Sequence, residues 1–171
     1  VRLEGHADNV TPALLGGCQA VVHDGDRVVA NTVPVAPELR AVVFVPDLPM
    51  STRDTRDVLA EQVTREDAVF NLGRVAMLVN SLSSGRTEHL RIATQDRLHQ
   101  PAREKIFPAM KYIFRAAQDA GAAGVFLSGG GSSILALATS NFMTIGFEMA
   151  NAADKMGLSG NTTVTSPSSL G

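Results

Sequence analysis

The first residues of the chain carry a dense group of polar side chains. His6 and Asn9 are three positions apart, so both side chains can face one side of a helical turn. Asp8 can cap a helix predicted over residues 9–15, and a pair of glycines can end it. An imidazole and a carboxamide on one face can bind one small polar ligand. The spacing equally fits a capping Asp8, a surface histidine and an asparagine bonded to the backbone.

Two arginines occupy positions that differ from an exposed helix face. Arg56 follows Thr52 by four residues at a capped helix start, which places the hydroxyl and the guanidinium on the same face. Arg103 follows a junction where a proline separates two predicted helices. An arginine fixed at such a junction can bind a carboxylate through two hydrogen bonds. An ion pair with Asp96 or Glu104 is the alternative for Arg103.

A glycine-rich segment, Ser128–Ser133, separates two short apolar runs. Its backbone N–H groups can form a nest that binds an anion. The same glycines can instead make a tight connection that lets another backbone approach closely. No Lys-Ser or Lys-Thr pair follows, so the segment is not a Walker loop.

Composition excludes several classes of protein. The 171 residues have a formal net charge of −2, with no basic stripe that would indicate nucleic acid as a partner. No apolar run has the roughly 20 residues that a membrane span needs. Cys18 is the only cysteine, and its place at the start of an apolar strand favours a buried, unreactive thiol. One unpaired cysteine fits a reducing, cytoplasmic location. No spacing of His, Cys, Asp and Glu predicts a zinc site, and no Gly-x-Ser-x-Gly pattern predicts acyl transfer.

The order of the predicted elements indicates an α+β fold with split βαβ units. An Asp-Gly turn joins two apolar runs into a hairpin over residues 17–35. Further strands are predicted over residues 39–46, 124–127, 133–137 and 162–165. Helices are predicted over residues 51–62, 64–81, 87–98, 103–120 and 141–156. The helix over 64–81 is apolar nearly all round, which predicts a central place in the core. His99, at the predicted end of the 87–98 helix, is expected to interact with its C-terminal dipole.

Four stretches resemble one family of enzymes. Residues 4–17, EGHADNVTPALLGG, resemble the EGHPDNVAPALLGG signature of bacterial homoserine kinases. AVFNLGR at 68–74 and DRLHQPAR at 96–103 are similar to two further stretches of that family. LSGGGSS at 127–133 resembles the third motif of the wider GHMP small-molecule kinases. The matches occur in order over nearly the whole chain.

The resemblance implies the GHMP kinase two-domain fold. Residues 1–38 would be the end of the ribosomal-protein-S5-like, ATP-binding N-terminal domain. Residues 39–171 would be a ferredoxin-like C-terminal domain. The chain begins with Val1 inside a motif, and the family's phosphate-cradling loop is missing. We therefore expect a fragment with a processed or truncated N-terminus that is inactive alone.

The resemblance also implies phosphoryl transfer from ATP to the side-chain hydroxyl of L-homoserine, in threonine biosynthesis, with Mg²⁺. Asn9 would be the catalytic contact to the substrate hydroxyl. The implied substrate-binding residues are His6, Asp8, Asn9, Thr52, Arg56 and Arg103. Gly129, Gly130, Gly131 and Ser132 would lie near the phosphates of ATP, and Glu4 would be the Mg²⁺ ligand.

Two alternatives remain open. The first is another GHMP kinase that acts on a different small alcohol. The second is a non-catalytic, ferredoxin-like ligand-binding module. For the kinase, the expected partners are L-homoserine, ATP and a second copy in a homodimer, with no nucleic acid and no membrane.

Overall fold

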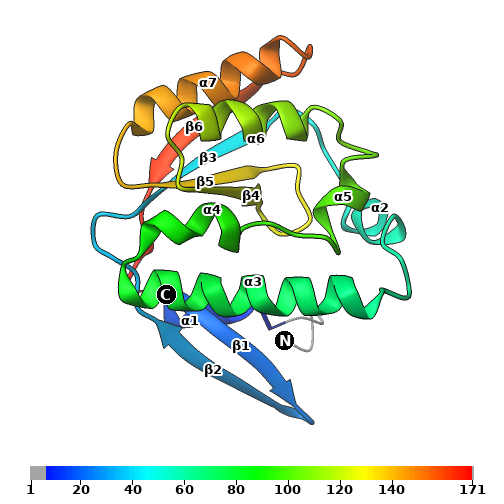
Figure 1. Ribbon diagram of the computed structural model, residues 1–171, viewed down its shortest axis with the longest axis vertical. Helices are drawn as coiled ribbons and strands as arrows, with labels where there is room; N and C mark the ends of the chain where they lie inside the picture. Colours follow the sequence, from blue (N-terminus) through cyan, green and yellow to red (C-terminus); the bar gives the residue numbers. More distant parts are fainter. Residues whose placement is uncertain (1–6, 171) are drawn as a thin grey trace.

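Two antiparallel sheets organise residues 7–170, the part of the chain that the computed structural model describes (Figure 1). Glu4 and His6 lie outside this part, and so does the side chain of Thr52. The first sheet is a hairpin of β1 (Cys18–Asp24) and β2 (Arg27–Val33), paired from Cys18↔Val33 to Asp24↔Arg27. Gly25 supplies the left-handed turn between them, with φ of 58°. The predicted hairpin is confirmed. Helix α1 (Val10–Leu15) precedes it.

The second sheet has four strands in the order β4-β5-β3-β6. Its strands are β3 (Arg40–Pro46), β4 (Gly124–Leu127), β5 (Ile134–Ala138) and β6 (Gly160–Thr165). Every neighbouring pair is antiparallel. Helical segments connect β3 to β4, and a helix connects β5 to β6, which is the βαββαβ order of a ferredoxin-like domain. The predicted α+β fold is therefore confirmed.

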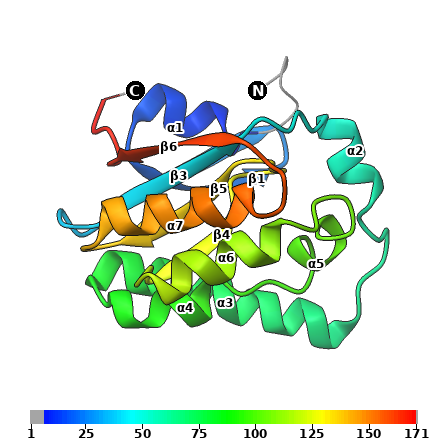
Figure 2. The same ribbon diagram turned by 90° about the horizontal axis from the view of Figure 1, so that it is seen from above.

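Helices α6 (Met110–Asp119) and α7 (Phe142–Asp154) lie side by side over one face of this sheet (Figures 1 and 2). Alternate strand residues face them, because side chains in a strand point to opposite faces with period two. The fully buried core residues on the strands are Val42, Phe44, Ile134, Ala136 and Ala138. Their buried partners on the helices are Ile113, Ala117, Ile145, Met149 and Ala153.

The segment between β3 and β4 differs from the predicted helices. Its elements are α2 (Thr52–Asp57), α3 (Arg65–Ser84), η1 (Thr87–His89), α4 (Leu90–Ala93) and α5 (Gln100–Arg103). The helix predicted over 103–120 is confirmed only from Met110 to Asp119, as α6. Its predicted start is wrong, because α5 ends at Arg103 and Pro108 lies between the two helices. A proline lacks the N–H that a helix interior needs, so it separates the two helices.

The helix predicted over 87–98 ends early, at Ala93. The Asp96 carboxylate accepts hydrogen bonds from the backbone N–H groups of Leu98, His99 and Gln100, which start α5 instead. His99 is thus the residue before a helix rather than the last residue of one. The expected interaction with a C-terminal dipole is wrong for this reason.

Helix α3 has the predicted start but not the predicted burial. Thr64 Oγ1 accepts a hydrogen bond from the Asp67 N–H across 3.0 Å, as its capping sequence predicts. Its apolar side chains, however, are largely exposed: Val69 is 61% and Leu72 is 69% exposed. The prediction of a central core helix is wrong, because α3 lies beyond α4 from the four-stranded sheet and most of its apolar side chains stay exposed (Figure 1).

Candidate active site

A cleft of about 520 Å³ opens where α1, α2, α5 and the β4–β5 loop meet. Figure 1 shows α2 and α5 next to the loop between β4 and β5. The cleft is lined by Asp8, Asn9, Met50, Thr55, Arg56, Leu59, His99, Arg103, Gly129, Gly130 and Gly131. The structure therefore brings seven of the predicted site residues to one cleft. These residues come from segments that span most of the chain.

Arg103 is a buried cation of the cleft that two backbone carbonyl groups hold. Its residue is only 9% exposed. Its Nε donates a hydrogen bond to the Thr55 carbonyl oxygen (3.3 Å), and its Nη1 donates one to the Gly129 carbonyl oxygen (3.1 Å). Burial lowers the pKa of the guanidinium and the nearby Asp96 charge raises it, with burial dominant. An arginine stays protonated at neutral pH, so Arg103 presents a fixed positive charge.

Neither anionic partner predicted for Arg103 forms a direct ion pair with it among the described residues. Glu104 instead pairs with Lys111 (3.2 Å). Asp96 acts on Arg103 through its charge only. The direct bonds of Arg103 go to neutral carbonyl oxygens, so its positive charge is not cancelled by a contacting carboxylate.

The glycine loop, residues 128–133, packs directly against α2. A Cβ built on Gly130 would lie 2.8 Å from Thr55 Oγ1, which is too close for a real side chain. The Ser128 N–H donates to the Ser133 carbonyl oxygen (2.9 Å), and the Gly131 N–H donates to Ser128 (3.0 Å). The loop is therefore closed by its own bonds and gives one carbonyl, that of Gly129, to Arg103.

Asp8 and Asn9 lie at the start of α1 and are both exposed. The Asp8 carboxylate accepts a hydrogen bond from the N–H of its neighbour Asn9 (3.0 Å). The helix begins with Asn9 as its N-cap, without a side-chain cap hydrogen bond. The prediction that Asp8 caps this helix is therefore wrong, and both polar side chains are left at the cleft.

Among the predicted residues that the structure describes, Ser132 is not brought to the cleft. Ser132 donates its hydroxyl hydrogen bond to the Leu48 carbonyl oxygen (2.6 Å) and does not line the cleft. Glu4, His6 and the Thr52 side chain lie outside the described residues. Within residues 7–170, no group of three His, Cys, Asp or Glu side chains could hold a metal ion.

Sequence reasoning missed Thr55 and His99 as cleft residues. Thr55 is 2% exposed and supplies both the carbonyl that holds Arg103 and the surface that Gly130 contacts. A signal existed for Thr55, since Thr52 and Thr55 are three apart and share a helix face. His99 lies next to the acceptor Asp96, with His99 Nδ1 3.4 Å from Asp96 Oδ1.

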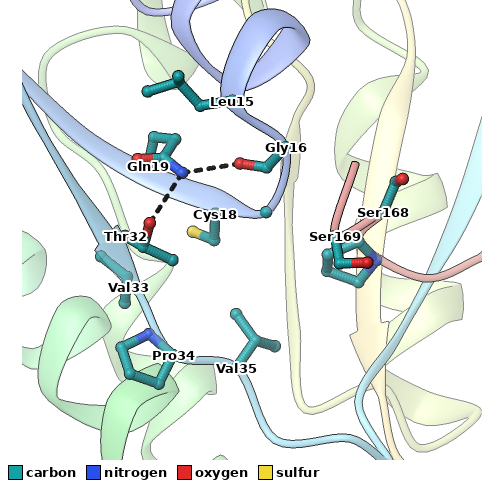
Figure 3. Close-up of a pocket in the computed structure, with 12 residues that line it drawn as sticks. Leu15, Gly16, Cys18, Gln19, Thr32, Val33, Pro34, Val35, Ser168 and Ser169 are labelled. Carbon is teal, nitrogen blue, oxygen red and sulfur yellow. Dashed lines mark hydrogen bonds between the residues drawn. The ribbon is translucent and has the colours of Figure 1, made fainter. Parts of the chain in front are cut away.

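A second cavity, of about 300 Å³, lies between the hairpin and the segment near the C-terminus (Figure 3). Gln19 Nε2 donates to the Gly16 carbonyl (2.7 Å) and to Thr32 Oγ1 (3.1 Å) at its edge. Cys18 lines it, and burial raises the pKa of the Cys18 thiol. A raised pKa keeps the thiol protonated, which agrees with an unreactive cysteine.

The fold is that of the C-terminal domain of GHMP small-molecule kinases. Residues 78–142 match the family described as GHMP kinases C terminal. None of the helices in residues 7–170 combines the length and the apolar content needed to cross a membrane.

Two homoserine kinases and one mevalonate kinase are similar to this chain. A homoserine kinase of Persephonella marina is 39% identical over 157 residues, covering 92% of this chain and 52% of that protein. The crystal structure of homoserine kinase from Cytophaga hutchinsonii superposes with a TM-score of 0.92 at 34% identity, covering 97% of this chain and 53% of the other. L. major mevalonate kinase shares the fold alone, with a TM-score of 0.64 at 16% identity over 96% of this chain and 54% of the other.

The chain contains a GHMP kinase C-terminal domain, and it is homologous to homoserine kinases over most of its length. It spans about half the length of the curated relatives it matches.

Proposed function

We propose that the full-length protein that contains this chain phosphorylates the side-chain hydroxyl of L-homoserine with ATP. The product would be O-phospho-L-homoserine, an intermediate of threonine biosynthesis. The observation that carries the proposal is the buried Arg103, fixed by the carbonyls of Thr55 and Gly129 in a cleft that Arg56 and Asn9 also line. The homoserine kinases among its relatives support the choice of substrate.

The two arginines suit an α-carboxylate. A guanidinium offers several N–H donors in one plane, and a carboxylate accepts two of them at once. Arg103 would bind the carboxylate from a fixed position. Arg56 and Thr52 on α2 would bind the same end of the substrate. Holding that end of the substrate restricts where its distal hydroxyl can lie, which lowers the entropy cost of in-line attack.

Asn9 would contact the reacting hydroxyl, with Asp8 and His6 near the amino group and the pocket wall. The hydroxyl oxygen forms the new bond to the γ-phosphorus, the bond from that phosphorus to ADP breaks, and the hydroxyl proton leaves to solvent or phosphate. Phosphoryl transfer passes through a loose transition state that needs little prior removal of this proton. A carboxamide that orients the hydroxyl is therefore sufficient in principle.

ATP and Mg²⁺ complete the proposal. Mg²⁺ would neutralise charge on the transferring phosphates, as it does in other phosphoryl transfers. Glu4, which the resemblance to the family implies, is the proposed ligand in this chain. Gly129, Gly130, Gly131 and Ser132 are proposed to lie near the phosphates. The closed hydrogen bonds of the loop equally support a purely structural role for these four residues.

We also propose the division into an N-terminal domain ending near residue 38 and a C-terminal domain over 39–171. The separate hairpin sheet and four-stranded sheet support it. A cytoplasmic location and a homodimer are proposed with the kinase function. Light scattering of the full-length protein tests the dimer.

The test is a coupled assay of ADP release by the full-length protein, with and without L-homoserine. We expect ADP release that depends on L-homoserine and a phosphorylated amino acid as product. The isolated chain of 171 residues is expected to be inactive. Mevalonate is included as a second substrate because this chain shares its fold with a mevalonate kinase. Release of ADP with mevalonate but not with L-homoserine would favour the alternative, a GHMP kinase that acts on a different small alcohol. Absence of ADP release with any small alcohol would favour the non-catalytic module.

A further inference from the structure

A carboxylate outside the cleft holds the helix that carries Arg103. Asp96 has a side chain that is 14% exposed and lies in the turn before α5. Its Oδ2 accepts the backbone N–H groups of His99 (2.8 Å) and Gln100 (2.5 Å). Its Oδ1 accepts the N–H of Leu98 (3.2 Å). The first turn of α5 is therefore organised around one carboxylate.

Asn71 of α3 holds this carboxylate from the other side. Asn71 Nδ2 donates to Asp96 Oδ1 across 2.6 Å. The carbonyl oxygen of the same side chain, Oδ1, accepts the Arg97 N–H across 3.0 Å. One amide side chain thus connects α3 to the turn through both of its polar atoms, so the turn cannot move without breaking both bonds.

Helix α5 has a second anchor at the end of strand β4. Gln100 Oε1 accepts the Leu127 N–H across 3.0 Å. Leu127 directly precedes the glycine loop, whose Gly129 carbonyl accepts from Arg103. A helix of four residues has almost no rigidity of its own, because most of its backbone groups lack partners within the helix. The direction of the Arg103 side chain therefore depends on these external bonds.

We infer that Asp96, held by Asn71, is a positioning residue that fixes α5 and thereby sets where the Arg103 guanidinium meets the substrate carboxylate. This inference rests on the proposed function, since it assigns the purpose of the network to that cleft. The negative charge of Asp96 also favours the buried guanidinium at longer range.

The network explains why the direct partners of Arg103 are neutral. A carboxylate in contact with the guanidinium would compete with the substrate for its donors. The Asp96 carboxylate instead accepts hydrogen bonds from backbone N–H groups and does not contact the guanidinium. It therefore orients α5 and attracts the positive charge of Arg103 at longer range, and it leaves the guanidinium donors to the substrate.

The test uses the full-length protein and the variants Asp96→Asn, Arg103→Ala and their combination. Asparagine keeps the shape of Asp96 but replaces one acceptor by a donor and removes the charge. Loss of hydrogen bonds to a charged group predicts about a tenfold rise in KM for L-homoserine, with KM for ATP within about twofold of its original value. In the Arg103→Ala background, Asp96→Asn is expected to cause no further rise in KM.

A merely structural role gives a different pattern. General loosening would change both KM values, or would lower activity equally with and without Arg103. Either result would overturn the inference. The matched control is Asp119→Asn, which removes an exposed carboxylate that pairs with Arg115 (3.7 Å) on α6 and should change neither KM value.

Asn71→Ala provides a second route if Asp96→Asn does not fold. It removes both bonds of the amide and leaves the carboxylate in place, so we expect a smaller rise of KM for L-homoserine in the same direction. If Arg103→Ala raises this KM and neither Asp96→Asn nor Asn71→Ala does, the proposed function stands and the positioning role is wrong. If the unaltered protein neither binds nor phosphorylates L-homoserine, the proposed function itself is wrong and the inference falls with it.

Discussion

Gly130 packs so closely on Thr55 that the Thr55 hydroxyl lies where a Cβ atom at position 130 would need room. The distance from Thr55 Oγ1 to a Cβ built on Gly130 would be 2.8 Å. The carbonyl of Thr55 and the carbonyl next to Gly130, that of Gly129, both accept from Arg103. Close packing of the loop on α2 therefore fixes the distance between the two acceptors that hold the arginine.

In the chain of 171 residues, Gly130→Ala is expected to lower the free energy of unfolding by about 1–3 kcal/mol, the usual cost of overpacking a tight contact. Chemical unfolding measures this change. Gly73→Ala on α3, measured in the same chain, is the control, because nothing lies within 4 Å of its added Cβ. Alanine also favours a helix over glycine, so the control should be neutral or stabilising by up to about 1 kcal/mol. Equal effects of the two substitutions would contradict the contact.

Arg103→Lys and Arg56→Lys are expected to differ in their effect on KM for L-homoserine. A lysine keeps the charge but loses the planar donors that reach two carbonyls and a carboxylate together. Arg103 is buried and doubly anchored, whereas Arg56 is exposed. We expect about a tenfold rise for Arg103→Lys and a smaller rise for Arg56→Lys in steady-state kinetics. A larger effect at Arg56 would show that α2, not α5, carries the main carboxylate contact.

The acid stability of the protein should depend on Asp96. Burial by itself raises the pKa of Asp96, but hydrogen bonds from Asn71 and from the N–H groups of Gln100, His99 and Leu98 outweigh it and lower the pKa. A carboxyl with a lowered pKa in the folded state stabilises the protein above its ordinary pKa of 3.8. That stabilisation is lost as the pH falls below 3.8 through the folded pKa.

Unfolding by urea at a series of pH values checks this expectation. The free energy of unfolding of the unaltered protein should fall on acidification below the ordinary pKa of Asp96. Asp96→Asn should be less stable near neutral pH and should show a shallower fall in acid. A variant curve parallel to that of the unaltered protein would mean that Asp96 has the same pKa folded and unfolded.

The exposed apolar side of α3 should be covered in a longer protein. The relatives are about twice as long as this chain, and we expect the additional segment of such a protein to pack on Val69, Leu72 and Val75. Leu72→Gln should then lower the melting temperature of the full-length protein, since a buried leucine contributes roughly 1.5–3 kcal/mol.

In the isolated chain, the same substitution should reduce the binding of a dye that reports exposed apolar surface. Met143→Gln on α7 is the control for a single exposed apolar residue away from α3. An unchanged melting temperature of the full-length Leu72→Gln variant would mean that this side of α3 stays exposed there too.

Chelation should abolish the proposed kinase activity. We expect EDTA to stop ADP release by the full-length protein and added Mg²⁺ to restore it, because the ion offsets charge on the transferring phosphates. Glu4→Gln should raise the Mg²⁺ concentration needed for half-maximal rate. If the unaltered protein and the Glu4→Gln variant regain activity at the same Mg²⁺ concentration, Glu4 is not the ligand.

The sequence by itself determined several local elements and the resemblance to a family. The Asp-Gly turn defined the hairpin, and a β-branched run ended by proline defined β3. Thr64 marked the start of α3 through its own hydrogen bond to the Asp67 N–H. These features depend on neighbours within a few residues, so the chain alone encodes them.

Only the tertiary structure decided what surrounds each element. Periodicity could not show that α3 would be exposed, because an apolar helix has the same pattern whether or not another segment covers it. It could not show that Asn71 would hold Asp96, or that Thr55 and Gly129 would hold Arg103. Those contacts join residues 25, 48 and 26 positions apart, and only folding of the whole domain brings such partners together.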